Sequence, residues 1–284
     1  MLYIVATPIG NLEDITARAV RVLGEVDLIA AEDTRHSRGL LTHFKIKTPM
    51  FSCHKFNEGK RGDFFVNALL EGKSVALISD AGTPCISDPG FKLVRLASEA
   101  GIEIVAVSGA CAAVAALSVS GFDVSRFGFV GFLPRGKAAI PLLTDSLFYN
   151  ETVVFYESPK RIATTLKLIE ENLPKALICL CNDISKKFER IYRGTPDEVL
   201  FEISQNPSAE KGEYTCVIFL PKTENPLNKN TADEPAVQSL ESQLVDIMLK
   251  SNCNLKDASK ILHESTKTSK KEIYSAMLRL KNLF

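Results

Sequence analysis

Short apolar runs alternate with amphipathic segments along the first 120 residues of the chain. The runs predict strands over 2–6, 28–31, 50–53, 75–78 and 103–107. Between them, apolar side chains recur every three or four residues and predict a helix from Asp14 and helices over 37–44, 58–70, 91–100 and 110–119. Strict alternation of this kind is typical of parallel βαβ units, so an open, doubly wound α/β sheet is expected.

The pattern starts again after residue 120 and predicts a second α/β domain over 121–222. Strands are expected over 127–131, 152–156, 176–181, 189–193 and 215–220, and helices over 140–147, 161–171 and 196–203. The strands at 189–193 and 215–220 do not simply alternate with helices, which indicates a mixed sheet.

Residues 223–235 are rich in proline and poor in large aliphatic side chains, so they read as a linker. Periodic segments over 237–249, 255–262 and 270–280 then predict a small helical module over 236–284, which resembles a helix-turn-helix. This module has eight Lys or Arg against five Asp or Glu. A packing or dimerisation appendage fits the same composition equally well.

The composition narrows the class of protein. Hydrophobic residues make up 45% of the 284, which excludes global disorder. The 34 basic and 34 acidic residues cancel, which argues against a protein that coats nucleic acid by charge alone. The seven scattered cysteines favour reduced thiols and offer no metal-ligand spacing. No run reaches the length of a membrane span or signal peptide, so a soluble cytoplasmic protein without a membrane partner is expected.

The sequence G-F-L-P-R-G-K-A at 131–138 nearly matches a phosphate-binding P-loop. It lacks two features that a P-loop needs, because Ala138 has no hydroxyl to bind Mg²⁺ and Pro134 has no backbone N–H to bind phosphate. No G-x-G-x-x-G follows a strand, and no G-x-S-x-G elbow supports a catalytic triad. Nucleotide hydrolysis, nicotinamide chemistry and serine-type hydrolysis therefore find no support.

Polar turns follow the ends of seven predicted strands, at 7–13, 32–35, 54–58, 79–89, 108–112, 131–137 and 157–161. Ligands bind at the carboxyl ends of strands in open α/β sheets, so these turns predict a small-molecule cleft shared by the two domains. The alternative is that they only cap helices. The longest turn, within L-I-S-D-A-G-T-P-C-I-S-D-P-G at 77–90, is expected to be site in its first half and helix N-cap in its second, at Ser87-Asp88-Pro89.

An ordered set of motifs carries a resemblance to a known family. A-T-P-I-G-N-L-E-D-I-T, A-E-D-T-R, L-I-S-D-A-G-T-P-C-I-S-D-P-G, G-F-L-P-R, Y-E-S-P-K-R and K-K-F-E resemble the tetrapyrrole methylase family, and within it the enzymes that methylate a cytidine 2′-hydroxyl of 16S rRNA. The resemblance covers residues 1–222, and the tail resembles the helical module of those enzymes. It implies S-adenosylmethionine as methyl donor between two α/β domains, a homodimer, and a cytidine of the decoding region, in 16S rRNA or the 30S subunit, as target.

The same resemblance implies a cofactor site. The corresponding residues are Pro8, Asp80, Ala81, Gly82, Thr83, Pro84, Gly109, Cys111, Ala112, Tyr156, Glu157 and Gly212. The chain departs from the family pattern at Ser108 and Cys111, at Lys160 in place of histidine, and at Asn182-Asp183-Ile184-Ser185 in place of R-E-L-T.

The hydroxyl has to lose its proton, either to a carboxylate or lysine or late to water. Glu32, Arg35 and Glu58 are the catalytic candidates at strand ends, and no spacing singles out one. Lys186, Lys187, Arg190 and Arg193, interleaved with aromatic side chains, predict an RNA-binding surface. A solvated edge strand fits that stretch equally well. Two further functions stay open, a tetrapyrrole C-methyltransferase and a non-catalytic nucleic-acid-binding protein.

Overall fold

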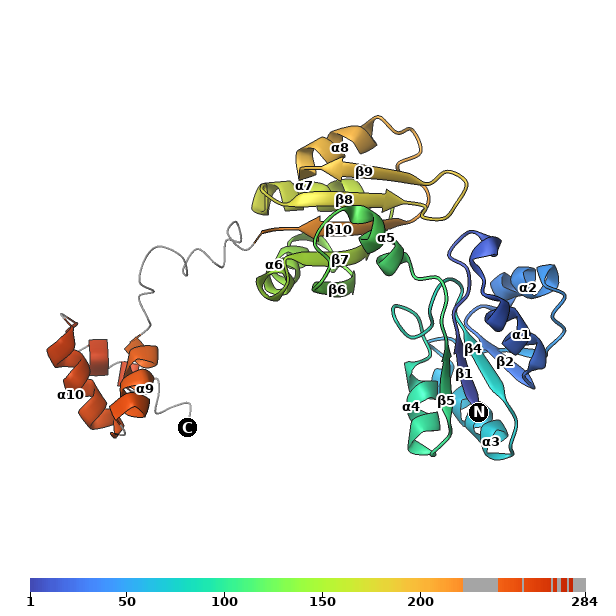
Figure 1. Cartoon of the computed structure of the whole chain (residues 1–284), viewed down its shortest axis with the longest axis horizontal. Helices are drawn as coiled ribbons and strands as arrows, with labels where there is room; N and C mark the ends of the chain where they lie inside the picture. The colour runs from blue at the N-terminus through green and yellow to red at the C-terminus, as the bar shows by residue number, and fades with distance from the viewer. Residues whose placement is uncertain (222–239, 252, 267, 270–271, 275, 278–284) are drawn as a thin grey trace. The chain divides into compact units, whose positions relative to one another are not determined.

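The computed structural model describes residues 1–221, 240–251, 253–266, 268–269, 272–274 and 276–277 (Figure 1). The chain forms two compact units, Met1–Asn225 and Pro226–Phe284, which are described separately. The predicted linker at 223–235 lies outside the described residues, and the predicted domain limits stay predictions.

The first sheet of the larger unit is fully parallel, as predicted, with the strand order β3-β2-β4-β1-β5. Its strands are β1 (Leu2–Val5), β2 (Leu28–Ala31), β3 (Met50–Ser52), β4 (Val75–Ile78) and β5 (Ile104–Val107). Every side chain of β4 is buried, because this strand lies at the centre of a sheet with helices on both faces.

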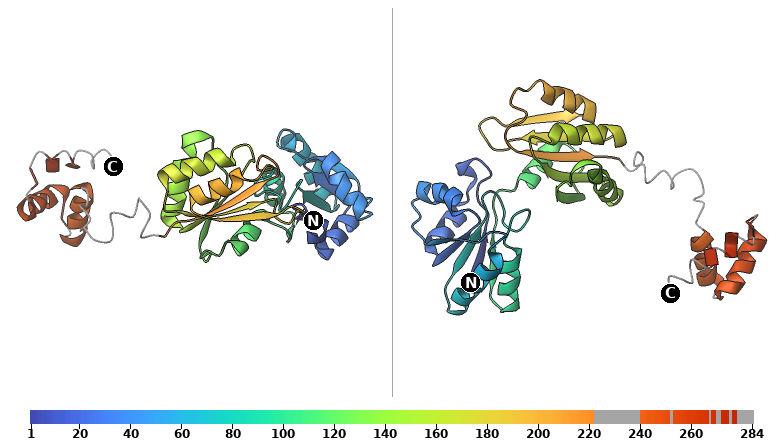
Figure 2. Two further views of the ribbon diagram at one scale, coloured as in Figure 1. Left: turned by 90° about the horizontal axis from the view of Figure 1, so that it is seen from above. Right: turned by 180° about the vertical axis from the view of Figure 1, so that it is seen from behind.

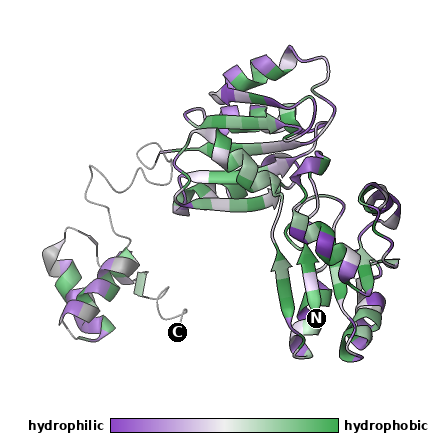
Figure 3. Cartoon of the chain, turned by 45° about the vertical axis from the view of Figure 1, so that its right-hand side comes forward, coloured by the Kyte–Doolittle hydropathy of each residue, from purple (hydrophilic) through white to green (hydrophobic). Residues whose placement is uncertain are grey.

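Alternate residues of these strands enter two separate cores. Ala76 and Ile78 pack with α1 (Ala17–Glu25) and α2 (Thr34–His43), whereas Val75 and Leu77 pack with α3 (Glu58–Leu70) and α4 (Phe91–Glu99). Figure 3 shows the resulting hydrophobic colouring along the strands. The doubly wound arrangement predicted from the sequence is therefore confirmed.

The second sheet is mixed, as predicted, with the order β6-β7-β10-β8-β9. Its strands are β6 (Phe127–Phe132), β7 (Thr152–Glu157), β8 (Leu177–Asn182), β9 (Arg190–Gly194) and β10 (Tyr214–Phe219). Strand β10 runs antiparallel to both of its neighbours, and β6 runs parallel to β7.

Helices also cover both faces of the second sheet (Figure 2). One face packs against α6 (Ala139–Tyr149), α7 (Ile162–Asn172) and α8 (Pro196–Ser204), and the other against α5 (Ala112–Ser120). Helix α5 thus follows the last strand of the first sheet in sequence but buries its side chains on the second. This places the start of α5 where the two sheets meet.

Several helix starts differ from the prediction. Helix α1 begins at Ala17 rather than at Asp14, and α5 begins at Ala112 rather than at residue 110. Helix α2 begins at Thr34 rather than at residue 37, because the Asp33 carboxylate caps it by accepting the Arg35 N–H at 2.8 Å.

Helix α4 begins at Phe91 as predicted, and only its cap differs. The expected N-cap of α4 at Ser87-Asp88-Pro89 is wrong. The cap residue is Gly90, with φ of 130° and no side-chain cap, so Ser87 and Asp88 stay in the loop. A side chain at Gly90 would also meet Cys85 and Leu77 at 2.7 Å.

The smaller unit contains α9 (Leu240–Ser251), α10 (Leu255–Ser265) and helical residues at 272–274 and 276–277. Leu244, Ala258, Leu262, Ile273 and Ala276 form its core. The third predicted helix lies partly outside the described residues, and the helix-turn-helix likeness stays a prediction. No helix among the described residues combines the length and hydropathy that crossing a membrane requires.

Candidate functional site

A cavity of about 350 Å³, called here the main cavity, lies in the larger unit where loops of both sheets meet. From the first sheet it is lined by the loops that follow β1, β4 and β5, together with the start of α5. From the second it is lined by the ends of β6 and β7, the loop after β8 and the start of β10. Its size lies within the usual range of small-molecule sites.

Hydrogen bonds between loops hold the first wall together. The Thr7 N–H donates to the Gly82 carbonyl at 2.9 Å, and the Gly82 N–H donates back to Thr7 at 3.0 Å. The Thr83 hydroxyl donates to the Ala110 carbonyl at 3.2 Å. The loops after β1, β4 and β5 are thereby fixed as one surface, because each is bonded to another.

Tyr156 connects the second sheet to this surface. Its hydroxyl accepts the N–H of Ala113 at 3.3 Å, in the first turn of a helix whose own N-cap residue, Cys111, provides no side-chain cap. The ring packs against Phe129 and Phe132. Burial raises the pKa of Tyr156 to about 12, with Cys111 adding to the effect. The phenol is therefore neutral and serves as a structural cap in the cavity wall.

Glu157 is buried, and its carboxylate is already bound by side chains of α7. Arg161 forms an ion pair with it at 3.0 Å, and the Thr165 hydroxyl donates to it at 2.8 Å. A buried charge needs such partners. Glu157 therefore orders the loop after β7, and Glu157 and Ser158 both line the cavity.

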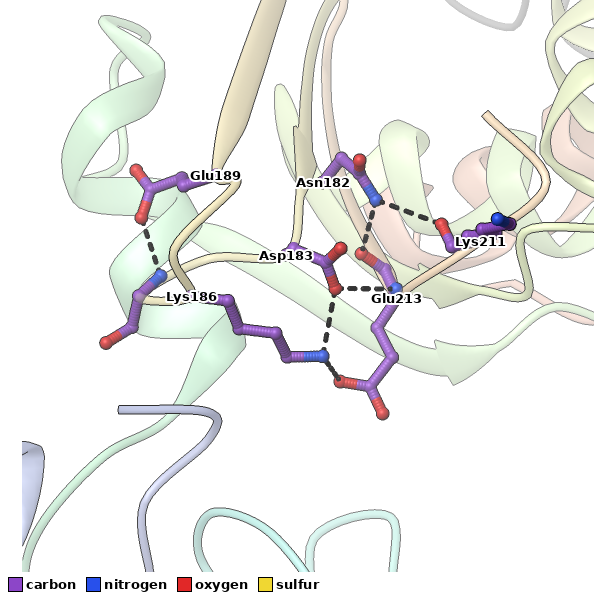
Figure 4. A network of polar contacts seen from close by, with 7 residues as sticks. Asn182, Asp183, Lys186, Glu189, Lys211 and Glu213 are labelled. Atoms are coloured by element: carbon purple, nitrogen blue, oxygen red, sulfur yellow. Dashed lines mark hydrogen bonds and ion pairs between the residues drawn. The ribbon is translucent and has the colours of Figure 1, made fainter. Parts of the chain in front are cut away.

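A second polar network fixes the loop after β8 (Figure 4). The ammonium group of Lys186 binds Asp183 at 2.9 Å and Glu213 at 2.8 Å, while the Glu213 N–H donates to Asp183 at 3.2 Å. Gly212 makes this approach possible, since its φ is +81° and a Cβ there would overlap the Asp183 carboxylate. The network holds Ile184 and Glu213 at the cavity.

Acidic side chains gather at the ends of β2 and β4. The Asp33 N–H donates to Asp80 at 3.1 Å, and the Asp80 N–H donates to Glu32 at 3.4 Å. Burial raises the pKa of Glu32; the Asp80 N–H opposes this, and the charges of Asp88 and Asp80 add to it. Burial likewise raises the pKa of Asp88, opposed by the Ser79 hydroxyl and supported by the charge of Asp80. Asp88 is the member that lines the main cavity.

The charge of the main cavity is one-sided. Asp88, Glu157 and Glu213 line it, and no Lys, Arg or His does so among the residues that the structure describes. Arg161 and Lys186 offset two of these carboxylates from outside the lining. The remaining wall is largely apolar, with Ile9, Ile86 and Phe132 among its side chains. The cavity thus suits a ligand with an apolar body and a positive charge.

Known proteins are similar to this chain in sequence. The family model described as "Tetrapyrrole (Corrin/Porphyrin) Methylases" matches residues 1–200. A "Ribosomal RNA small subunit methyltransferase I" of Pasteurella multocida is 48% identical over 77% of this chain and 78% of its own length. One of Synechocystis is 39% identical over 99% of this chain and 98% of its own length. The chain belongs to the ribosomal RNA small subunit methyltransferase I branch of the tetrapyrrole methylase family. The predicted family is confirmed.

A solved structure agrees with the tetrapyrrole methylase fold. A diphthine synthase superimposes with a TM-score of 0.62, covering 83% of this chain and 97% of its own at 14% identity. At that identity the likeness concerns the fold alone. The two-sheet architecture predicted for a tetrapyrrole methylase is thereby confirmed.

Seven of the twelve predicted cofactor residues of this tetrapyrrole methylase line the main cavity. They are Ala81, Gly82, Thr83, Cys111, Ala112, Tyr156 and Glu157. The other five, Pro8, Asp80, Pro84, Gly109 and Gly212, do not line it. Asp80 instead receives the Asp33 N–H, Gly109 lies close to Ala6, and Gly212 lies against Asp183. Contact with a cofactor stays a prediction for all twelve.

The three catalytic candidates are placed differently from one another. Glu32 lies beside the main cavity, next to Asp88 and Asp80. Arg35 is 88% exposed and bound to Asp33. Glu58 begins α3, and its side chain is outside the described residues.

The four predicted RNA-binding cations also differ. Lys186 belongs to the network with Asp183, and Arg193 donates to the Val119 carbonyl at 2.6 Å. Lys187 lies over the Phe188 ring in the loop before β9, and Arg190 is the first residue of β9, which is an edge strand. Both side chains are exposed. Lys187 and Arg190 therefore remain the available members of this set.

The cavity also contains residues outside the predicted set. They are Ile9, Ile86, Ser87, Asp88, Phe132, Ser158, Pro159, Ile184, Glu213, Tyr214 and Thr215. The sequence predicts Ser87 and Asp88 as part of a helix cap. An N-cap residue directly precedes its helix, and α4 begins at Phe91, so their separation from Phe91 along the sequence argues against that prediction. Tyr214 and Thr215 enter from the start of an antiparallel strand, which a rule based on the carboxyl ends of strands does not find.

Proposed function

We propose that the chain is an S-adenosylmethionine-dependent methyltransferase that methylates the ribose 2′-hydroxyl of a cytidine in the decoding region of 16S rRNA. The observation that carries this is the main cavity itself, which is shared by both sheets, rich in carboxylates and free of basic lining residues in the described part of a tetrapyrrole methylase chain.

The lining fits the chemistry of this methyl donor. S-adenosylmethionine carries a sulfonium and an ammonium group and no phosphate, so it requires carboxylates rather than a P-loop lysine. The acidic residues of the lining give the cavity a negative charge, while Ile86, Phe132 and Ile184 offer apolar contact for the adenine ring. Gly82, with φ of +77°, lets the backbone of its loop pass within reach of Ile9.

When bound, the donor supplies an already activated methyl group, so the protein has to orient the ribose and receive its proton. We assign the proton acceptor to Asp88. It lines the main cavity, and its pKa is raised by burial, which makes its carboxylate a stronger base. The negative charge of Asp80 raises the pKa of Asp88 further. Among the three predicted candidates, Glu32 lies beside Asp88, whose charge raises the pKa of Glu32.

The substrate of the assigned family is a component of the small ribosomal subunit, so 16S rRNA or the 30S subunit is the proposed partner and the cytoplasm the proposed location. Lys187, Arg190 and the basic tail would contact its phosphates. The family resemblance supports a homodimer, which sedimentation velocity of the full chain tests directly.

Incubation with methyl-labelled S-adenosylmethionine tests the function. Label is expected in 16S rRNA of unmodified 30S subunits, at a cytidine that becomes resistant to alkaline cleavage. Label in uroporphyrinogen and none in rRNA would replace the proposal with tetrapyrrole methylation. Calorimetry that detects RNA binding but no donor binding would point to a non-catalytic protein.

A further inference from the structure

A second cavity, of about 410 Å³, lies between the loop after β6 and the loop after β7. Its polar lining consists of Arg135, Ser158, Lys160, Arg161, Thr164 and Thr165. No Asp or Glu lines it among the described residues. We propose that this cavity, called here the basic cavity, binds a backbone phosphate of the RNA strand next to the methylated ribose. This inference rests on the proposed function and adds a binding subsite to it.

The three cations of the basic cavity have different roles. Arg161 is fixed, because it binds the buried Glu157 at 3.0 Å and donates to the Leu133 carbonyl at 2.7 Å. Its charge is largely offset by Glu157. Arg135 and Lys160 are exposed, and the described part of the chain places no carboxylate within ion-pair distance of either. The basic cavity therefore has two uncompensated positive charges, those of Arg135 and Lys160, beside the fixed side chain of Arg161.

The start of α7 adds a third attraction for an anion. This 11-residue helix has Arg161 as its N-cap, without a side-chain hydrogen bond to its first turn. Thr164, in that turn, lines the basic cavity with its neighbours. The positive end of a helix dipole favours anions, and here it coincides with the two exposed cations Arg135 and Lys160 and with the Thr164 side chain.

The position of the basic cavity links it to methyl transfer. Ser158 lines both this cavity and the main cavity, so the two adjoin at one residue. A ribose in the main cavity carries one phosphate on its 5′ side and another on its 3′ side. The basic cavity adjoins the main cavity, so one of these phosphates is the group that we assign to it. An RNA phosphodiester has a single charge and no need of Mg²⁺.

Binding of a singly charged phosphate without Mg²⁺ accounts for the incomplete match to a P-loop in the sequence. The stretch Gly131–Ala138 does connect a strand to a helix, β6 to α6, and Arg135 and Gly136 line the basic cavity. Pro134 and Ala138 remove the features that a nucleoside triphosphate needs. What remains is suited to a singly charged phosphate.

The test uses a double variant, Arg135→Gln with Lys160→Gln, in the full chain. The matched control is Arg126→Gln with Lys167→Gln, which removes one Arg and one Lys from exposed positions before β6 and on α7, outside the basic cavity. Equilibrium binding to 16S rRNA is measured over a series of KCl concentrations. Donor affinity and thermal melting establish that each variant is folded.

The double variant is expected to bind RNA about tenfold more weakly at low salt. Its plot of log affinity against log salt should be shallower by about 1, which corresponds to one lost phosphate contact. The control should keep the slope of the unaltered protein. Donor affinity should not change in either.

Equal slopes for the double variant and the control would overturn the proposal. Direct binding of inorganic phosphate is measured for the same proteins. If the unaltered protein binds phosphate, the double variant does not, and the RNA slope is unchanged, the cavity holds free phosphate and the proposal is overturned as well. If the slope changes but the unaltered protein transfers no methyl group to rRNA, the proposed function fails while the phosphate site stands.

Discussion

Asp88 combines the two properties expected of a proton acceptor, a place in the lining of the main cavity and a pKa raised by burial. Asp88→Asn should lower kcat by about 10²-fold or more, because the amide cannot take the ribose proton. Donor affinity, measured by calorimetry, should change by only a few-fold. The acid limb of the pH–rate profile, which reports this carboxylate, should disappear in the variant.

Glu32 supplies the comparison for Asp88. Glu32→Gln should reduce kcat far less, since Glu32 does not line the main cavity. If Asp88→Asn keeps kcat at saturating donor and loses donor affinity instead, Asp88 binds the cationic donor and the acceptor lies elsewhere.

Glu32 also predicts a dependence of stability on pH. Its pKa is raised in the folded protein, mainly by burial, so folding favours the protonated acid. The free energy of unfolding therefore falls as pH rises from the usual glutamate pKa through the raised one. Glu32→Gln removes this loss and should raise the melting temperature at about pH 7 but hardly at about pH 4.

Asp27→Asn is a control in which the melting temperature at about pH 7 should change in the opposite direction. The Ser74 N–H and hydroxyl lower the pKa of Asp27, so its carboxylate stabilises the fold above the usual aspartate pKa and ceases to do so as pH falls. This variant should melt lower at about pH 7 than the unaltered protein. A Glu32→Gln variant that also melts lower there would contradict the assigned cause.

At the scale of elements, the loop after β8 and the turn before β10 depend on each other through Gly212. Its positive φ and the overlap of a Cβ with Asp183 predict that Gly212→Ala strains the turn and displaces the Asp183–Lys186 ion pair. Gly121→Ala, at the end of α5, has a similar φ of +78° but nothing within 4 Å of the new Cβ.

Chemical denaturation should therefore distinguish the cost of backbone strain at a positive φ from the cost of disrupting the contacts of Asp183. Gly121→Ala is expected to cost about 1–2 kcal/mol for the left-handed backbone. Gly212→Ala should cost about 1.5 kcal/mol more, because charged hydrogen bonds are lost as well. Equal losses would mean that the network around Asp183 contributes nothing to folding.

The elements themselves were largely predictable, because burial on one or both faces sets their periodicity. The strand at 75–78 and the helix at 58–70 agree with β4 and α3 in both bounds. The site was predictable only in part. Sequence order says nothing of the antiparallel strand that brings Tyr214 and Thr215 to the cavity, or of the bond from the Ala113 N–H to Tyr156. Such contacts depend on how two sheets meet.

At the scale of the whole molecule, binding chemistry and charge are distributed unevenly. Every residue of the main and basic cavities lies in the Met1–Asn225 unit. Residues 236–284 contribute eight Lys or Arg against five Asp or Glu, in a chain whose net charge is zero. We therefore propose that the larger unit holds donor and nucleotide and that the tail adds affinity for RNA.

A chain that ends at Asn225 tests this division. It should bind S-adenosylmethionine with the affinity of the full chain, because its two sheets keep their own cores. Its affinity for 16S rRNA should fall, and the salt dependence of binding should become shallower by about 1 or more, since tail cations no longer meet phosphates. Turnover at saturating RNA should stay close to that of the full chain. If the shortened chain binds RNA with an unchanged slope, the tail serves packing or dimerisation, and sedimentation velocity would then show a change of assembly instead.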